Sequence, residues 1–221
     1  MNLPARKPLR LALIGMSGVG KTFWAKQLAE HGHPIACCDD EIERTLGSRL
    51  AKGGFQGIHG MAAWMGWPNS PTYVQRESEY LAAEIAVLDK ILTHIEKHPE
   101  QSLILDTTGS IIYTGTNLLL RLRRQMTVVH LAVSEAEQEL LIRRYLSDPK
   151  PVLWRGAFQP KAMENPRQTV ARCYPMLIAA RRQSYQALAH CTVQIAELKG
   201  IDGSEIVGAT RFLENIQDRT Q

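Results

Sequence analysis

The stretch Gly15-Met16-Ser17-Gly18-Val19-Gly20-Lys21-Thr22 has the form GxxxxGK[ST]. It follows an apolar run at residues 9–14 that reads as a buried strand, and it precedes a helical pattern that begins at Phe23. In this context the glycines let main-chain N–H groups curl around phosphates, with the positive end of a helix dipole beneath them. The alternative is a glycine-rich turn that carries Gly-Lys-Thr by chance, which would need four residue types in register between strand and helix. The stretch therefore predicts binding of a nucleoside triphosphate.

Two side chains of this stretch have separate expected roles. Lys21 supplies a positive charge for the β and γ phosphates, and Thr22 supplies a hydroxyl for Mg²⁺. The cofactors expected are therefore ATP and Mg²⁺. Basic residues of a later, proline-containing segment, which we interpret as a lid, complete the site. Within the quoted stretch the expected ATP-binding residues are Gly15, Ser17, Gly18, Val19, Gly20, Lys21 and Thr22.

Strand-like runs alternate with helical patterns along the rest of the chain. The expected strands are residues 9–14, 35–38, 102–105, 127–133 and 191–195, and the clearest helix covers residues 73–97. Such alternation is typical of an α/β fold with a parallel sheet and helices on both faces. A chain of 221 residues accommodates one such domain, residues 1–221. Within it we expect a substrate-binding insertion at about 45–75 and a lid at about 148–168.

Composition sets limits on location and partners. The four cysteines fit neither metal-ligand spacing nor a disulfide framework, and no stretch reads as a signal peptide or a membrane span. We therefore expect a cytoplasmic protein with no membrane partner. Residues 121–182 carry twelve Lys or Arg and five Asp or Glu. A phosphate-rich ligand explains this bias as well as nucleic acid would, and nucleic acid is not the expected partner. The oligomeric state cannot be read from the sequence.

Acidic residues follow the second and third expected strands, where ligands of open α/β sheets bind. Asp39 is the first residue past the second strand and is placed to face the transferring phosphate, whereas Asp40 and Glu41 suit the first turn of a helix. Asp106 ends the third strand and suits Mg²⁺. Asp-Thr-Thr-Gly at 106–109 also matches the DxxG of GTPases, but no Asn-Lys-x-Asp motif follows. The expected catalytic residues are Lys21, Asp39 and Asp106, and the expected metal ligands are Thr22 and Asp106.

Residues 47–71 form an irregular region, rich in glycine, that also carries Phe55, Trp64 and Trp67. Aromatic residues among glycines can form the wall of a substrate pocket. They can equally pack the small core of a loop-rich subdomain, and the sequence leaves both interpretations open.

From the phosphate-binding loop nearly to the fifth strand, the chain resembles the shikimate kinase family. Asp39-x-x-Ile42-Glu43 is similar to the family's D-x-x-I-E, and Arg76-x-x-Glu79 is similar to its R-x-x-E. The resemblance implies the three-layer sandwich of a P-loop kinase, with five parallel strands and a lid. It also implies that Asp39 is the presumed base and that Arg76 holds a substrate carboxylate.

Three later segments extend the resemblance. Thr108-Gly109-Ser110 lies where the family has a glycine triplet, and Lys150-Pro151-Val152-Leu153 looks like its lid motif R-P-L-L. Arg144 looks like the family's adenine-stacking arginine, and Arg181, four residues before Tyr185, like a second carboxylate-binding arginine. For Arg181 a role in a surface ion pair is an equal alternative. The expected substrate-binding residues are Asp39, Arg76, Gly109, Ser110 and Arg181.

The chain departs from the family where the substrate is chosen. Cys37 replaces an acid two residues before Asp39, the triplet keeps one glycine, and Lys150 replaces the lid arginine. Lysine cannot make the planar bidentate contact of arginine, so Arg155 is a candidate substitute. About a dozen extra residues lie between Asp39 and Arg76. These departures suggest an acceptor other than shikimate, or a pocket of different shape.

Three functions are consistent with the sequence. The first is an ATP-dependent kinase that phosphorylates a hydroxyl of a small anionic metabolite, either shikimate or a related hydroxy acid. The second is a kinase of nucleotides or nucleic-acid ends, which the basic lid suggests. The third is a non-catalytic ATP-binding regulatory protein that keeps the fold and has lost the acceptor site.

Overall fold

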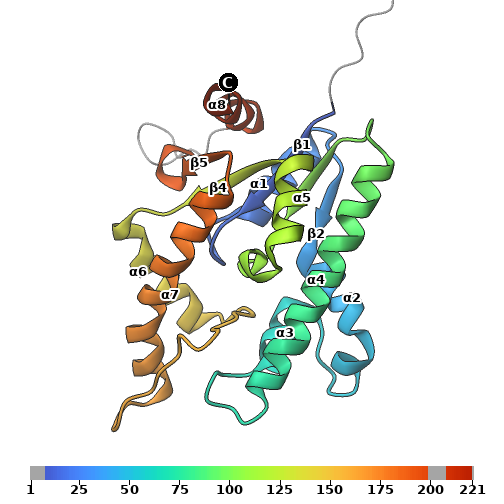
Figure 1. Ribbon diagram of the computed structural model, residues 1–221. Coiled ribbons are helices and arrows are strands. Elements are labelled where there is room, and N and C mark those ends of the chain that lie inside the picture. The colour runs from blue at the N-terminus through green and yellow to red at the C-terminus, as the bar shows by residue number, and fades with distance from the viewer. Residues whose placement is uncertain (1–7, 199–207, 221) are drawn as a thin grey trace, which may run out of the picture.

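The computed structural model describes residues 8–198 and 208–220. Its centre is a five-stranded sheet in the order β2-β3-β1-β4-β5, in which every pair of neighbours is parallel (Figure 1). The strands are β1 (Arg10–Ile14), β2 (Ile35–Cys37), β3 (Leu103–Asp106), β4 (Thr127–Ala132) and β5 (Cys191–Gln194). Each lies where the sequence predicts a strand, with ends that differ by about one residue. The α/β prediction is confirmed.

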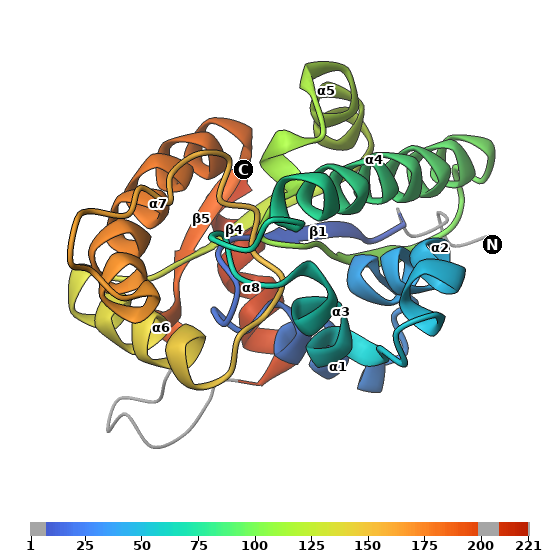
Figure 2. The same cartoon turned by 90° about the horizontal axis from the view of Figure 1, so that it is seen from below.

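Helices cover both faces of this sheet (Figure 2). α1 and α8 lie on one face, and α4, α5 and α7 lie on the other. The helices are α1 (Lys21–Glu30), α2 (Cys38–Ala51), α3 (Gly57–Met65), α4 (Tyr73–Lys97), α5 (Thr116–Gln125), α6 (Glu135–Ser147), α7 (Pro166–Leu188) and α8 (Ala209–Thr220), with 3₁₀ turns η1 (Ile111–Tyr113) and η2 (Ile195–Leu198). The arrangement is the expected three-layer sandwich.

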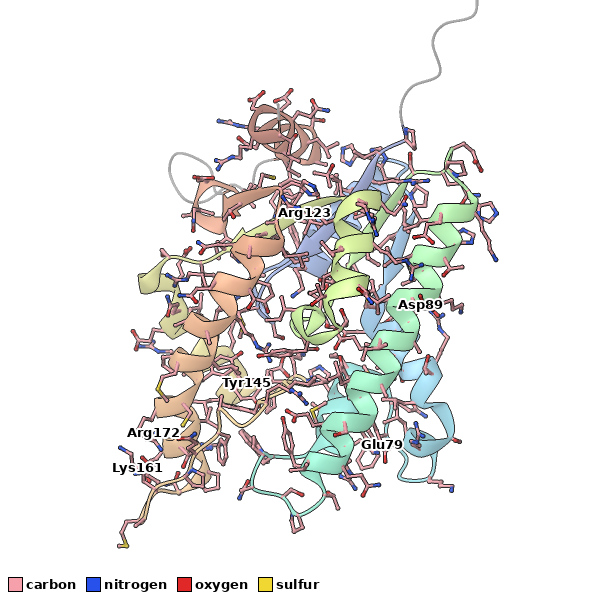
Figure 3. The ribbon with its side chains drawn as sticks, in the orientation of Figure 1. Glu79, Asp89, Arg123, Tyr145, Lys161 and Arg172 are labelled. Carbon is pink, nitrogen blue, oxygen red and sulfur yellow. The ribbon has the colours of Figure 1, made fainter. Side chains whose placement is uncertain are left out.

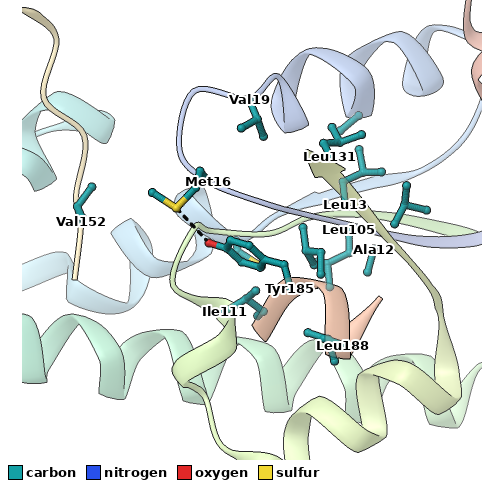
Figure 4. Close-up of a cluster of buried hydrophobic side chains, with 14 of the residues drawn as sticks. Ala12, Leu13, Met16, Val19, Leu105, Ile111, Leu131, Val152, Tyr185 and Leu188 are labelled. Carbon is teal, nitrogen blue, oxygen red and sulfur yellow. Dashed lines mark hydrogen bonds between the residues drawn. The ribbon is translucent and has the colours of Figure 1, made fainter. Parts of the chain in front are cut away.

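The core is continuous from the sheet to the underside of the phosphate-binding loop (Figure 4). Leu13 and Leu105 of neighbouring strands are fully buried, and Met16 of the loop is 4% exposed. The Tyr185 hydroxyl of α7 contacts the Met16 sulfur at 3.7 Å. The loop is therefore supported from below by core packing, which holds its main chain in place.

The predicted helix at residues 73–97 is α4. Apolar residues at intervals of three and four bury one face, including Leu88, Leu92 and Ile95. Besides Tyr73 at its start, α4 also buries three residues with polar groups, Glu77, Tyr80 and Glu84. Since buried polar groups need partners, these three positions indicate where α4 meets the functional region.

The interpretation of residues 47–71 as irregular is wrong for half of that region. α2 continues to Ala51 across a kink at Gly47, and residues 57–65 form α3. Met61, Trp64 and Met65 of α3 are buried, at a spacing that fits one helix face. The glycines concealed this pattern, because glycine lowers helix propensity in any short window.

The segment between α6 and α7, which contains most of the predicted lid, has no helix or strand. Its middle is nevertheless fixed, since Leu153 and Trp154 are buried. The Tyr73 hydroxyl of α4 donates to the Val152 carbonyl at 2.7 Å and accepts from the Trp154 N–H at 3.0 Å. That this segment acts as a lid stays a prediction, and an opening of its middle would have to break these contacts of Tyr73.

The far end of this segment is tied to α7 (Figure 3). Arg172 lies near Lys161 at one end of the molecule, and its Nε bonds Glu164 Oε1 at 2.7 Å. Glu164 also accepts from the Lys161 N–H at 3.1 Å.

No helix among the described residues is long and apolar enough to cross a bilayer.

Candidate functional site

Three glycines shape the loop between β1 and α1. Gly15, Gly18 and Gly20 have φ values of 142°, 85° and 99°, which side chains rarely adopt. A Cβ atom on Gly15 would also lie 2.6 Å from the Leu131 carbonyl oxygen of β4. The loop conformation therefore requires glycine, and the predicted phosphate cradle lies at the carboxyl end of the central strand.

Lys21 is folded back onto this loop. Its Nζ donates to the carbonyl oxygens of Gly15 and Met16, each at 3.0 Å, and the residue is 7% exposed. Burial lowers the pKa of Lys21, and the nearby carboxylates of Asp106 and Asp39 act in the opposite direction. A buried ammonium held by carbonyls at the edge of a phosphate-binding loop is well placed to exchange those carbonyls for phosphate oxygens.

The loop opens into a cavity of about 400 Å³, called here the central cavity. Its walls come from the phosphate-binding loop, the end of β2, the turn after β3, the helices α2, α3 and α4, and the segment after α6. The lining residues are Ser17, Gly18, Gly20, Lys21, Thr22, Cys37, Asp39, Asp40, Ile58, Tyr80, Thr107, Thr108, Gly109, Lys150 and Pro151. The structure thus brings most of the phosphate-binding loop, Lys150, Asp39 and Gly109 to one space.

Asp39 lies in the first turn of α2, and its Oδ1 accepts a hydrogen bond from the Tyr80 hydroxyl at 3.0 Å. Burial raises the pKa of Asp39 to about 6, although the positive charge of Lys21 and the Tyr80 hydrogen bond both lower it. A carboxylate with a pKa near the working pH suits proton transfer. Tyr80, which the sequence analysis did not single out, orients this carboxylate.

Asp106 is 2% exposed at the end of β3. Its Oδ2 accepts from the Cys37 thiol at 3.8 Å, whereas its Oδ1 is buried without a hydrogen-bond partner. Burial raises the pKa of Asp106, and the positive charge of Lys21 and the nearby Thr22 hydroxyl lower it. Magnesium in kinases is bound by one or two protein oxygens plus phosphates. The unsatisfied oxygen beside Thr22 fits that requirement, so these two residues fit a Mg²⁺ site.

Glu84 of α4 holds the turn after β3 and was missed by the sequence analysis. It accepts hydrogen bonds from the hydroxyls of Thr108 and Ser110, the latter at 2.7 Å. Burial raises the pKa of Glu84 to about 7, and the two hydroxyls lower it. Ser110, predicted to bind substrate, thus faces Glu84 and does not line the cavity. The sequence signal that could have identified Glu84 is an acidic residue on the apolar face of the predicted helix at residues 73–97.

Arg76 lies away from the central cavity. Its Nη1 donates to the Trp64 carbonyl oxygen, and its guanidinium carbon lies 5.8 Å from the centre of the Trp64 ring. Arg76 therefore braces α3 against α4. Its predicted role in holding a substrate carboxylate is not reflected in this placement.

Arg181 of α7 is 2% exposed. It donates from Nη1 to the Gly109 carbonyl at 2.8 Å, from Nη2 to the Leu153 carbonyl, and from Nε to the Tyr113 hydroxyl at 3.3 Å. Its guanidinium fastens the turn after β3 to the segment after α6. The alternative of a surface ion pair is excluded by this burial, and a role in substrate binding would require Arg181 to release main-chain carbonyls.

The three predicted basic residues of the lid region are placed differently from one another. Lys150 lines the central cavity and pairs with Asp148 at 2.9 Å. Arg144 donates to the Gly18 carbonyl at 3.1 Å and lines an adjoining space behind the loop. Arg155 is exposed, with its guanidinium carbon 5.9 Å from the centre of the Tyr113 ring. Lys150 and Arg144 therefore reach the donor side, and Arg155 does not.

No protein-family model and no curated protein matches this sequence. Among solved structures, a shikimate kinase from Acinetobacter baumannii in complex with shikimate is 24% identical, with a TM-score of 0.56 and coverage of 96% of this chain and 93% of that chain. Shikimate kinases from Bacteroides thetaiotaomicron and Aquifex aeolicus are each 15% identical, with TM-scores of 0.56 and 0.55. They cover 95% and 96% of this chain, and 97% and 95% of their own. The chain therefore has the P-loop kinase fold of the shikimate kinases, as the resemblance implies.

Proposed function

We propose that this protein is an ATP-dependent kinase that transfers the γ-phosphoryl group to a hydroxyl of a small molecule. The observation that carries the proposal is that Asp39 and the phosphate-binding loop line the same cavity. A carboxylate that faces a phosphate cradle serves phosphoryl transfer and is not needed for ATP binding alone. This favours a kinase over the alternative of a non-catalytic ATP-binding protein.

In the reaction we infer, Asp39 orients the acceptor hydroxyl and takes its proton. The hydroxyl oxygen bonds the γ phosphorus while the bond from that phosphorus to the β–γ bridging oxygen breaks, and ADP leaves. Lys21 neutralises charge on the phosphoryl oxygens, which is the main catalytic requirement of this chemistry. Arg144 of α6 and Lys150 of the segment after α6 add positive charge. When bound through Thr22 and Asp106, Mg²⁺ supplies further charge neutralisation.

The finer expectation, an anionic acceptor such as shikimate or a related hydroxy acid, is supported by the sequence resemblance. It depended on Arg76 and Arg181 as carboxylate ligands, and both are bonded to main-chain carbonyls. Shikimate is therefore the first acceptor to test, and its success would require these side chains to change partners. A kinase of nucleotides or nucleic-acid ends is the remaining alternative, and a steep salt dependence of binding would identify it.

The test is ATP consumption against a panel of hydroxy acids, sugars, their amides and nucleosides, followed by Asp39→Asn with the best acceptor. Because asparagine can still accept the Tyr80 hydrogen bond, the substitution removes the base with little change in shape. We expect kcat/KM to fall by about 100-fold or more. Asp218→Asn on the exposed side of α8 is the matched control. An Asp39→Asn variant with unchanged turnover would show that Asp39 is not the base.

A further inference from the structure

The central cavity has too few basic side chains to bind both the phosphates of ATP and an anionic acceptor. The only basic side chains among its described lining residues are Lys21 and Lys150. Both lie where the sequence and the loop geometry place the phosphates of the donor. The lining also carries two carboxylates, Asp39 and Asp40, together with the hydroxyls of Tyr80, Thr107 and Thr108.

With the two lysines engaged by phosphates, an acceptor meets carboxylates and hydroxyls. A carboxylate on the acceptor would then be desolvated beside acids of the same sign, which is unfavourable without a paired cation. Arg181 reaches the Gly109 end of the lining, but its guanidinium already donates to Gly109, Leu153 and Tyr113. The wall that faces the acceptor therefore favours hydrogen-bond donors and disfavours anions.

A second cavity of about 430 Å³ adjoins the first. The two share Lys150 and Pro151 in their walls, and the consecutive residues Ile58 and His59 of α3 line one each. This second space is called here the side cavity. Because the two cavities share these lining residues, an acceptor at Asp39 that extends past Lys150 and Pro151 would enter the side cavity.

The side cavity is mainly apolar. Trp67, Met65 and Val152 form its walls together with Tyr145 of α6, whose ring lies 6.0 Å from that of Trp67 and is stacked on Tyr174 (Figure 3). Ala63 leaves part of the α3 wall without a large side chain. The polar rim is His59 and Lys150, and both already pair with Asp148 at 3.1 and 2.9 Å. An apolar group gains most from filling such a space.

We infer that the acceptor is a hydroxylated molecule without an anionic group, neutral or cationic, that carries an apolar or aromatic arm. Its hydroxylated end lies at Asp39 and its arm lies in the side cavity, against Trp67 and Tyr145. This inference rests on the proposed kinase function for the orientation of the hydroxyl. It replaces the small anionic acceptor that the resemblance suggests.

The test uses three probes that share one ring: shikimate, its primary amide, and its N-benzyl amide. Binding is measured by calorimetry with Mg²⁺ and a non-hydrolysable ATP analogue present, so that the lysines are engaged. We expect the primary amide to bind about tenfold more tightly than shikimate. We expect the benzyl amide to bind about tenfold more tightly again.

Ala63→Leu fills the side cavity without removing any packing, and Ala86→Leu, an exposed position on α4, is its matched control. We expect Ala63→Leu to weaken the benzyl amide at least about tenfold more than it weakens the primary amide, and Ala86→Leu to change neither. Trp67→Ala provides a second variant with the same expected selectivity.

An amide that binds no more tightly than shikimate would overturn the assignment of charge. A loss of shikimate binding in Lys150→Met or Arg181→Gln would then identify the cation that reads the carboxylate. A benzyl amide that gains nothing, or whose gain survives Ala63→Leu, would overturn the assignment of the side cavity. ADP formation is measured separately with ATP. Probes that bind as expected without transfer would disprove the kinase function alone, whereas transfer with a preference for shikimate would disprove this inference alone.

Discussion

The donor side of the central cavity is made mainly by eight consecutive residues, 15–22, whereas the acceptor side collects side chains from α2, α3, α4 and the turn after β3. On the donor side, glycine dihedral angles and the start of α1 fix the geometry locally. The sequence predicts Arg76 and Arg181 for the acceptor side, yet neither lines the cavity and both bond main-chain carbonyls. A sequence motif predicts the geometry of a site when neighbouring residues determine that geometry. It does not predict which partner a long side chain contacts on a distant part of the fold.

The largest expected effect concerns the donor side. Lys21→Met should lower kcat/KM by about 100- to 1,000-fold, because the substitution removes a positive charge from the transferring phosphoryl group. Steady-state ADP formation with the best acceptor measures this effect. Lys26→Met, an exposed position on the same helix, is the control and should behave as wild type. A small loss of kcat/KM in Lys21→Met would show that Lys21 does not act on the transferring phosphoryl group, even though its position follows from the local motif.

The second prediction concerns the structural role of Arg181. Arg181→Met should lower the free energy of unfolding by about 2–4 kcal/mol, since the buried carbonyls of Gly109 and Leu153 lose their donor. Urea unfolding at pH 7 measures this, with Arg124→Met at an exposed position of α5 as control. Unchanged stability together with a raised KM for an anionic acceptor would instead make Arg181 a substrate ligand.

The third prediction concerns Asp39, where the two sides meet. Its pKa of about 6 predicts that kcat/KM falls about tenfold per pH unit below pH 6, because protonation removes the base. Tyr80→Phe removes a hydrogen bond that lowers this pKa, so the acidic limb should move to higher pH. A pH–rate profile of both proteins decides the matter. If the acidic limb of the profile does not move in Tyr80→Phe, the limb reports the titration of a group other than Asp39.

The smallest effect is expected for Arg76. Its contact with the Trp64 ring is worth about 0.5–1 kcal/mol at a partly exposed site. Arg76→Gln should therefore change kcat/KM for the best acceptor by less than about threefold, while it lowers the thermal midpoint slightly. A tenfold loss of kcat/KM with unchanged stability would place Arg76 at the acceptor and bring the chain closer to the family pattern.

The strands, α4, the phosphate-binding loop and the strand-end acids could be predicted because short sequence patterns determine them. α3 could not, since glycines mask its apolar face. Tyr80 and Glu84 were missed because their partners, Asp39 and the 108–110 turn, lie on other elements. The positions of Arg76 and Arg181 depend on which carbonyl groups the tertiary fold places beside them, and no spacing along the chain encodes that.

The central position of β1 makes the shape of the phosphate-binding loop depend on distant parts of the chain. β1 pairs with residues 103–106 of β3 and with residues 127–130 of β4. Gly15 is packed directly on Leu131, which belongs to β4. The entropy of closing these long stretches of chain has to be overcome before the contacts form, which makes such topologies slow to fold. The dihedral angles of the loop are encoded locally, but its place in the molecule is held by strands far away along the chain, so we expect ATP binding during refolding to recover no earlier than the pairing of β1 with β3 and β4.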